Sequence, residues 1–481
     1  MSIKRQAATG MAWNTIERFS TQGIRFILTI LLGRILSPND YGLLAMLIVF
    51  IALAQTVIDS GYSNALIQKK EKQEVDFSTA FYLNLSMSIL IYLIFFFSAP
   101  WIATFYEQPQ LVSITRVFAL FLITNTFGAI QMTRLVISLD FKRLAIASLI
   151  ATIVSGSVGL WMAFHGFGVW TLVYQSLIEN VVLVATLWVY TRWIPKRMFS
   201  WQSFRELFSF GSNIMFSNLL HTIYTNMYSL VIGKLFNASI LGYYNRAYTL
   251  GQFPVQNFGN VVAKVLYPIL CKYQDDNERF NHIFTNYLRI ASFLMFPLMI
   301  GLAVLAEPTI SVLLTNKWLP AVPLFQIVCL ALMWLPVMQM NVSVMDAKGN
   351  SRYHLRSEVV KKILAVAILL LSIPFGVTGI CWGLILYSFA DMTVAIAYSR
   401  KLTGVGYKKQ ALLLLPILCL SLIMGGIIWG STYHITSMEW KLIFGIPIGL
   451  LSYLLLTYLC RFPEWDTIIA LYKKHIIKKL Q

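Results

Sequence analysis

The sequence predicts an all-α membrane protein with about fourteen transmembrane helices, organised as two pseudo-symmetric six-helix lobes and two additional C-terminal helices. The composition, a series of long apolar segments and the placement of basic residues all predict this class. The chain has 481 residues, of which 58% are hydrophobic and only 12% are charged, and its mean hydropathy is +0.68. Soluble domains carry about 25% charged residues, so this composition indicates a polytopic membrane protein.

Apolar segments long enough to cross the hydrocarbon layer as helices, roughly 17 to 27 residues each, occur fourteen times. In chain order they are expected at residues 11–35, 41–62, 78–100, 111–133, 144–164, 167–190, 207–233, 240–266, 286–306, 319–342, 358–374, 378–399, 410–430 and 442–460. The first segment follows a short basic start but has no small-residue cleavage site. We therefore expect it to be kept as a helix and not removed as a signal peptide.

The basic residues alternate between the two sides of this topology. Thirty of the 38 Lys and Arg residues fall on one side, and the other side has only Arg34, Lys234, Lys317 and Lys441. By the positive-inside rule, both termini are expected in the cytoplasm. The net charge of +18 is thus explained by topology and by attraction to anionic headgroups, which excludes nucleic acid as the expected partner.

A repeat at an offset of 200 residues predicts the two lobes. The run Gly-Arg-Ile-Leu-Ser at 33–37 leads to Gly42, and the run Gly-Lys-Leu-Phe-Asn at 233–237 leads to Gly242. The copies are six helices apart, so they share an orientation and are expected to be related by an axis along the membrane normal. We expect one lobe at 1–200, the second at 201–402, two additional helices at 403–461 and a basic amphipathic tail at 462–481.

Polar side chains follow one face of the first apolar segment at a spacing of three or four residues. They are Asn14, Arg18, Gln22, Arg25 and Thr29. Arg25 lies roughly 21 Å along this helix, which is deep in the hydrocarbon layer. An arginine at that depth faces a water-filled cavity or a partner group. Two interpretations stay open: a cation in a functional pathway, or an ion pair with a carboxylate that serves packing.

Polar rows return at the start of the second half. The seventh segment carries two adjacent rows, Asn213, Ser217, His221 and Thr225 in one and Asn218, Thr222 and Asn226 in the other. The eighth segment carries a polar face of Asn245, Thr249, Gln252, Gln256 and Asn260, with Arg246 at its outer end. Such groups also bridge packed helices, but two adjacent rows exceed that need. We expect a hydrated central cavity lined by the first, second, seventh and eighth segments.

Motifs for catalysis are missing from the sequence. It has no P-loop, no H-E-x-x-H and no G-x-S-x-G. The outer connections are too short for the catalytic loop of a membrane glycosyltransferase or polymerase, and the five cysteines are too widely spaced for a metal site. We expect no enzyme, no metal and no cofactor other than a coupling cation, H⁺ or Na⁺, which stays an open alternative. The carboxylates that are candidates for such coupling are Glu17, Asp59, Glu179 and Asp391.

Three runs in the N-terminal part carry a resemblance to a known family. They are LGRILSPNDYGLLAM at 32–46, DSGYSNALIQ at 59–68 and DFSTAF at 76–81. They resemble the N-terminal signature of bacterial polysaccharide flippases, a branch of the multidrug/oligosaccharidyl-lipid/polysaccharide exporter superfamily. The resemblance implies alternating access and an undecaprenyl-pyrophosphate-linked oligosaccharide. This substrate would move from the inner to the outer leaflet of the bacterial cytoplasmic membrane, for exopolysaccharide, capsule or O-antigen (lipopolysaccharide) synthesis.

A phosphate-bearing glycolipid would need both cations and hydrogen-bonding groups. Guanidinium groups stay charged and offer forked donors to phosphate, so Arg18 and Arg25 are the expected pyrophosphate ligands, with Arg246 and Arg116 as further candidates. The candidates for the remaining polar contacts are Asn14, Gln22, Asn213, Asn218, His221, Asn226, Gln252 and Gln256. The expected partners are the lipid-linked oligosaccharide and membrane lipids, and other polysaccharide assembly proteins stay an open alternative. The other functions considered are an ion-coupled drug/cation antiporter and a membrane glycan polymerase or ligase.

Overall fold

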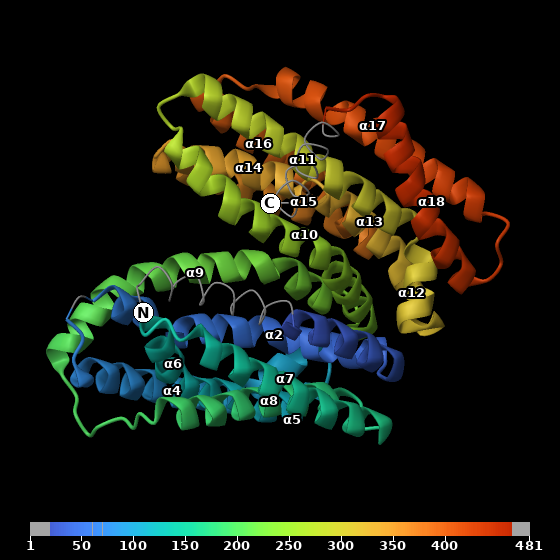
Figure 1. Cartoon of the computed structure of the whole chain (residues 1–481). Helices are drawn as coiled ribbons and strands as arrows, with labels where there is room; N and C mark the ends of the chain where they lie inside the picture. The colour runs from blue at the N-terminus through green and yellow to red at the C-terminus, as the bar shows by residue number, and fades with distance from the viewer. Residues whose placement is uncertain (1–19, 60, 70, 464–481) are drawn as a thin grey trace, which may run out of the picture. The chain divides into compact units, whose positions relative to one another are not determined.

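The structure is a computed structural model that describes residues 20–59, 61–69 and 71–463. The chain divides into two compact units, residues 1–245 and 246–481. In each unit, long helices run alongside one another (Figure 1). Within the described residues all regular structure is helical, as the sequence predicts.

Unit 1 is built mainly from long helices. Residues 20–35 form its first described helix. The following helices are α2 (Pro38–Asp59), α3 (Tyr62–Gln68), α4 (Glu74–Tyr106), α5 (Leu111–Phe118), α6 (Leu120–Ile137), α7 (Phe141–Phe164), α8 (Val169–Thr191) and α9 (Trp201–Leu235). Helix α9 packs against α2, α3 and α4, and α10 (Ala238–Lys272) runs from unit 1 into unit 2. The boundary predicted after residue 200 separates two sequence repeats, not the two compact units, and it stays a prediction.

Unit 2 holds the remaining helices. They are α11 (Asn277–Val304), α12 (Ala306–Leu314), the 3-10 helix η1 (Asn316–Ala321), α13 (Val322–Leu332), α14 (Leu335–Ala347), α15 (Ser351–Ser372), the 3-10 helix η2 (Ile373–Phe375), α16 (Gly376–Thr403), α17 (Tyr407–Thr432) and α18 (Met438–Leu459). Helices α15 and α16 pack side by side, and α17 packs against α11 and α18.

Each of the fourteen expected spans overlaps helix in the described part of the chain. Ten segments there are long and apolar enough to cross a membrane, and one of them, Ser351–Thr403, contains both α15 and α16. Helices α9 and α10 are not among the ten, because their polar rows lower the mean hydropathy. The chain is a multi-pass helical membrane protein.

The repeated motif has the same local role in both copies, since it starts a helix. At the start of α2, the backbone N–H of Asp40 donates to Ser37 Oγ at 3.2 Å, and Ser37 N–H donates to Asp40 Oδ2 at 2.9 Å. At the start of α10, the backbone N–H of Ile240 donates to Asn237 Oδ1 at 2.9 Å. Ser and Asn are strong N-cap residues because their side chains pair with otherwise unpaired N–H groups of the first turn.

The two helix starts meet at their glycines. A Cβ atom on Gly42 would overlap the carbonyl oxygen of Ala238, and a Cβ atom on Gly242 would overlap the carbonyl oxygen of Pro38. These contacts are reciprocal at an offset of 200 residues. A two-fold axis produces this reciprocity, because residue i of one copy then contacts residue j of the other and the reverse. This contact supports the predicted repeat.

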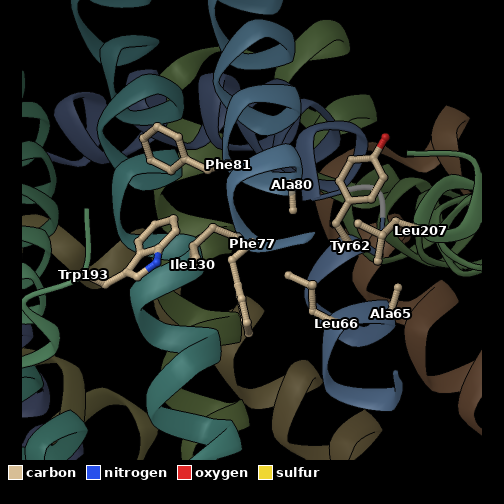
Figure 2. Packing of buried hydrophobic residues seen from close by; sticks show 9 residues of the cluster. All are labelled: Tyr62, Ala65, Leu66, Phe77, Ala80, Phe81, Ile130, Trp193 and Leu207. Carbon is tan, nitrogen blue, oxygen red and sulfur yellow. The ribbon is translucent and has the colours of Figure 1, made fainter. Parts of the chain in front are cut away.

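A hydrophobic cluster joins α3, α4, α6 and α9 near the linker that precedes α9. Figure 2 shows the nine side chains gathered between these elements: Tyr62, Ala65, Leu66, Phe77, Ala80, Phe81, Ile130, Trp193 and Leu207. The Trp193 indole donates to Glu74 Oε2 at 2.7 Å, and Arg134 pairs with Glu74 Oε1 at 2.9 Å. The linker is therefore fixed to α4 by both apolar and polar contacts.

A buried polar network ties α17 to the rest of unit 2. Asn341 of α14 and Gln410 of α17 exchange two amide hydrogen bonds, at 3.0 and 2.9 Å, and Ser399 of α16 donates to Asn341 Oδ1 at 2.6 Å. All three residues are buried. Buried amides are costly unless their groups are paired, so this network fixes the register of three helices at once.

Candidate functional site

An accessible arginine is the centre of the candidate site in unit 1. Arg25 Nη2 lies 2.6 Å from Glu179 Oε1 of α8, and Thr152 of α7 donates to the same oxygen at 3.3 Å. The Arg25 side chain is 60% exposed, whereas that of Glu179 is 26% exposed. The structure thus combines the two interpretations of Arg25: it has a carboxylate partner, yet its guanidinium keeps donors that a ligand can reach.

The polar rows of α9 have different surroundings along their length. Thr222 and Thr56 of α2 share a hydrogen bond of 3.1 Å between their hydroxyl oxygens, so this part of the row packs against α2. Asn226 donates to the Thr222 carbonyl oxygen at 2.9 Å. Asn218 and His221 are exposed. The polar rows of α9 therefore include groups that pack against α2, such as Thr222, and exposed groups, such as Asn218 and His221.

Two of the predicted arginines pack against aromatic rings. Arg116 lies 4.5 Å from the centre of the Phe96 ring and donates from Nε to the Phe96 carbonyl oxygen at 3.3 Å. Pro100, four residues on, has no N–H to pair with that carbonyl, so Arg116 replaces the missing helix bond. Arg246, in unit 2, is buried over Trp318 of η1, 5.6 Å from the ring centre. Within unit 1, the described contacts of Arg116 are with Phe96 and not with Arg25.

Some of the remaining predicted site residues lie within the part of the chain that the structure describes, and others lie outside it. Gln22 is half-buried in the first helix, and on α10 Gln252 is half-buried and Gln256 exposed. Asn14, Glu17 and Arg18 lie outside the described residues, and so does the side chain of Asn213. Asp59 is at the end of α2, where Ser63 donates to its Oδ1 at 3.2 Å.

Asp391, on α16, has a partner that sequence reasoning missed. Lys361 of α15 places Nζ 2.9 Å from Asp391 Oδ1 and 3.1 Å from Glu358 Oε1. The Lys361 side chain is only 4% exposed. The signal that could have found it is the i, i+3 spacing of Glu358 and Lys361 on a helix that is otherwise apolar beyond them.

An apolar groove of about 580 Å³ lies in unit 2. Its walls are α11, α17 and α18, with Pro254 and Phe258 of α10 and Thr309 of α12 at its margins. Gly445 and Gly449 of α18 contribute to the lining, and Phe293 and Tyr453 pack against one another with ring centres 5.2 Å apart. An apolar chain fits this lining, whereas a charged or sugar group does not.

The described residues contain no group of three or more His, Cys, Asp and Glu side chains that could hold a metal ion. In unit 1, the exposed guanidinium of Arg25 can bind an anion. In unit 2, the groove by itself fits an apolar chain.

Comparison with known proteins gives the family. Residues 31–323 match the family described as polysaccharide biosynthesis protein. Teichuronic acid biosynthesis protein TuaB of Bacillus subtilis (strain 168) is 27% identical over 465 residues, which cover 95% of this chain and 96% of that protein. Succinoglycan biosynthesis transport protein ExoT of Rhizobium meliloti (strain 1021) is 26% identical over 321 residues, covering 67% of this chain and 65% of that protein.

A solved structure of the lipid II flippase MurJ in an inward closed conformation has the same fold. It matches 94% of this chain and 99% of its own with a TM-score of 0.78, at 17% sequence identity. The family match covers more than half of the chain, and its N-terminal end includes the three runs on which the resemblance was based. The chain belongs to the polysaccharide biosynthesis protein family of membrane proteins.

Proposed function

We propose that the chain is a flippase that moves an undecaprenyl-pyrophosphate-linked oligosaccharide across the bacterial cytoplasmic membrane, from the inner to the outer leaflet, by alternating access. Membership of the polysaccharide biosynthesis family supports a role in exopolysaccharide, capsule or O-antigen synthesis. The positive-inside distribution supports cytoplasmic termini. The repeats at 1–200 and 201–402 would supply the two moving lobes, and the helices within 403–461 would be an addition to them.

The observation that carries the proposal is the accessible Arg25–Glu179 pair among membrane helices. An intramembrane arginine is costly and normally marks a functional pathway. A guanidinium binds phosphate with two parallel hydrogen bonds. With Glu179 on one nitrogen and the rest of the side chain exposed, Arg25 can accept a pyrophosphate without first being exposed by a rearrangement.

The other parts of the substrate have matching surfaces in the chain. The exposed Asn218 and His221 of α9 supply hydrogen-bonding groups for the glycan. We place the anionic group at Arg25 and the sugars on the polar row of α9, both in unit 1.

The test is transport by the purified full-length protein in proteoliposomes that contain labelled undecaprenyl-pyrophosphate oligosaccharide. Movement is measured as loss of label accessible to an enzyme added outside, and mass spectrometry checks that the lipid is unchanged. We expect the wild type to move the label, Arg25→Ala to lose most of the activity and Arg25→Lys to keep a part, because lysine retains the charge but not the forked donors.

Arg205→Ala is the matched control, since Arg205 is an exposed arginine of α9 outside the proposed site. Normal transport by Arg25→Ala would exclude Arg25 from the site. A change in the mass of the lipid would point to a polymerase or ligase. No movement by the wild type, together with export of cationic drugs, would favour the antiporter.

A further inference from the structure

The linker between α8 and α9, residues 192–200, follows a fixed path along the start of α4. In addition to its buried tryptophan, it is held there by two backbone hydrogen bonds. The N–H of Lys196 donates to Ser78 Oγ, and the N–H of Ser200 donates to Thr79 Oγ1, both at 3.1 Å. The two hydroxyl groups belong to buried side chains. The linker therefore cannot turn its outer side chains inward without breaking these bonds.

Those outer side chains include large apolar groups. Ile194 and Trp201 are 71% and 70% exposed, and Met198 and Phe199 are 40% and 45% exposed. The rings of Phe199 and Trp201 pack edge to face, with their centres 5.3 Å apart. Because burial of apolar surface is favourable, an exposed cluster of this kind marks a contact with a protein or a membrane.

Three exposed cations, Arg192, Lys196 and Arg197, lie among these apolar side chains in the sequence. The run from 192 to 201 contains no carboxylate, and none of the ion pairs among the described residues uses the three cations. Their charge is thus available to an anionic partner. We call the following seven residues the linker patch: Arg192, Ile194, Lys196, Arg197, Met198, Phe199 and Trp201.

The linker patch lies where the membrane-spanning part of unit 1 ends. The linker begins directly after one candidate span, Val169–Thr191, and is hydrogen bonded near the start of another, Glu74–Tyr106. Aromatic rings with a polar edge, tryptophan above all, concentrate at this boundary between hydrocarbon and water. The patch is therefore level with the lipid headgroups.

A bilayer fits the linker patch better than a protein partner does. The core of a protein interface is depleted of lysine, and a partner would have to supply carboxylates opposite three cations. A bilayer surface that contains anionic phospholipid already lies beside the ends of both spans and carries the opposite charge. Its phosphates suit the forked donors of Arg192 and Arg197, and its acyl boundary suits Ile194 and Trp201.

We propose that the linker patch is a binding site for anionic phospholipid and holds the linker at the membrane surface. The three cations bind headgroup phosphates, and the four apolar side chains enter between the headgroups. Because the linker continues directly into α9, the bound lipid fixes the start of that helix at the level of the headgroups. This inference goes beyond the proposed function, since it does not depend on which substrate is moved.

The experiment titrates dioleoyl phosphatidylglycerol into the purified full-length protein in a neutral detergent and measures the bound fraction by native mass spectrometry. We expect the wild type to prefer it to dioleoyl phosphatidylcholine. The triple variant Arg192→Gln, Lys196→Gln, Arg197→Gln should bind phosphatidylglycerol at least about tenfold more weakly, because each cation beside an anionic surface contributes about fivefold.

The matched control removes the same charge elsewhere. Arg352, Lys408 and Lys409 are exposed cations of unit 2, and their replacement by glutamine should change the affinity by less than about twofold. Melting temperatures measured without phosphatidylglycerol should equal that of the wild type for both triple variants, since every substituted side chain is exposed.

A second variant, Ile194→Ser with Trp201→Ser, keeps the cations and removes the apolar contacts. Its affinity for phosphatidylglycerol should also fall by about tenfold, whereas glycerol phosphate, which has no acyl chains, should bind the wild type far more weakly than the lipid does. Equal affinity of the wild type and the cation variant would overturn the proposal, and so would an equal loss in the control.

Two other results would reassign the linker patch. A wild type that does not prefer phosphatidylglycerol to phosphatidylcholine would overturn the proposal in favour of a protein partner. Binding of glycerol phosphate as tight as that of the lipid would overturn it in favour of a soluble anion. Lipid binding is the readout in each case, so these failures would leave the proposed flippase function standing.

Discussion

Gly42 of α2 and Gly242 of α10 each lie against the backbone that begins the other's helix, with Gly42 on Ala238 and Gly242 on Pro38. Alanine at either position would put a methyl group into a carbonyl oxygen, and backbone cannot move aside as a flexible side chain can. We predict that Gly42→Ala destabilises the protein by roughly 1–3 kcal/mol, the usual cost of overpacking, and that Gly242→Ala has a similar effect because the contact is reciprocal.

Thermal unfolding of the purified protein in detergent measures this. Gly426→Ala is the matched control, because a Cβ atom at Gly426 of α17 meets nothing within 4 Å. It should be neutral or slightly stabilising, since alanine favours helix. Equal melting temperatures for Gly42→Ala and Gly426→Ala would contradict the packing of the repeated glycines.

Glu179→Gln should strengthen anion binding. Glu179 occupies one donor of Arg25, so removal of its charge leaves the guanidinium more available to phosphate. We predict that undecaprenyl pyrophosphate binds roughly twofold to tenfold more tightly, which is a change of up to about 1.4 kcal/mol. Titration of the detergent-solubilised protein measures it. Thr152→Val, which keeps the carboxylate, should change the affinity little. Weaker binding by Glu179→Gln would mean that the carboxylate is needed to hold Arg25 in position.

Arg116 is expected to stabilise the fold and not to bind the substrate. Its Nε atom pairs with the Phe96 carbonyl oxygen beside Pro100, and loss of that donor leaves the carbonyl unpaired, at a cost of about 1–3 kcal/mol. We predict that Arg116→Met lowers the melting temperature while transport per folded molecule stays normal. If Arg116→Met instead had a normal melting temperature but no transport, Arg116 would be a pyrophosphate ligand, as predicted from the sequence.

The Lys69–Glu206 pair should give the stability a dependence on pH. Partial burial lowers the pKa of Lys69, but hydrogen bonds to Asp76 and Glu206 outweigh it and raise the pKa above 10.5. The same hydrogen bond lowers the pKa of Glu206 below 4.5. The stabilisation is therefore complete between these ordinary values. It is lost at high pH as Lys69 deprotonates and at low pH as Glu206 protonates.

Melting temperatures across pH test this pair. Glu206→Gln should flatten the decline below pH 4.5, and in a Lys69→Met background the same substitution should have no further effect. If the melting temperature of Glu206→Gln fell at low pH as much as that of the wild type, the loss of stability in acid would come from other carboxylates.

The sequence predicted the helices well because hydrophobic length is a local property. The ends of the polar helices were less accurate: the seventh expected span begins at 207 but α9 begins at Trp201. The tenth expected span, 319–342, is divided among η1, α13 and α14, where Pro320, Pro323 and Pro336 interrupt regular helix bonding.

The partners within the site were less predictable. Arg25 and Glu179 were both expected inside the membrane, but their pairing joins residues 154 positions apart and depends on how two helices are rotated. The burial of Lys361 depends in the same way on the register between α15 and α16. The packing of Arg116 on Phe96 likewise depends on how α5 packs against α4.

The hydrogen bonds among Asn341, Ser399 and Gln410 have a consequence for how the chain can be shortened. A protein truncated before Tyr407 would lose Gln410, but Asn341 would keep the Val337 carbonyl as acceptor for its amide N–H and the Ser399 hydroxyl as donor to its oxygen. The asparagine is therefore satisfied by α14 and α16 alone, so shortening the chain by its last two helices would not leave a buried amide without partners at position 341.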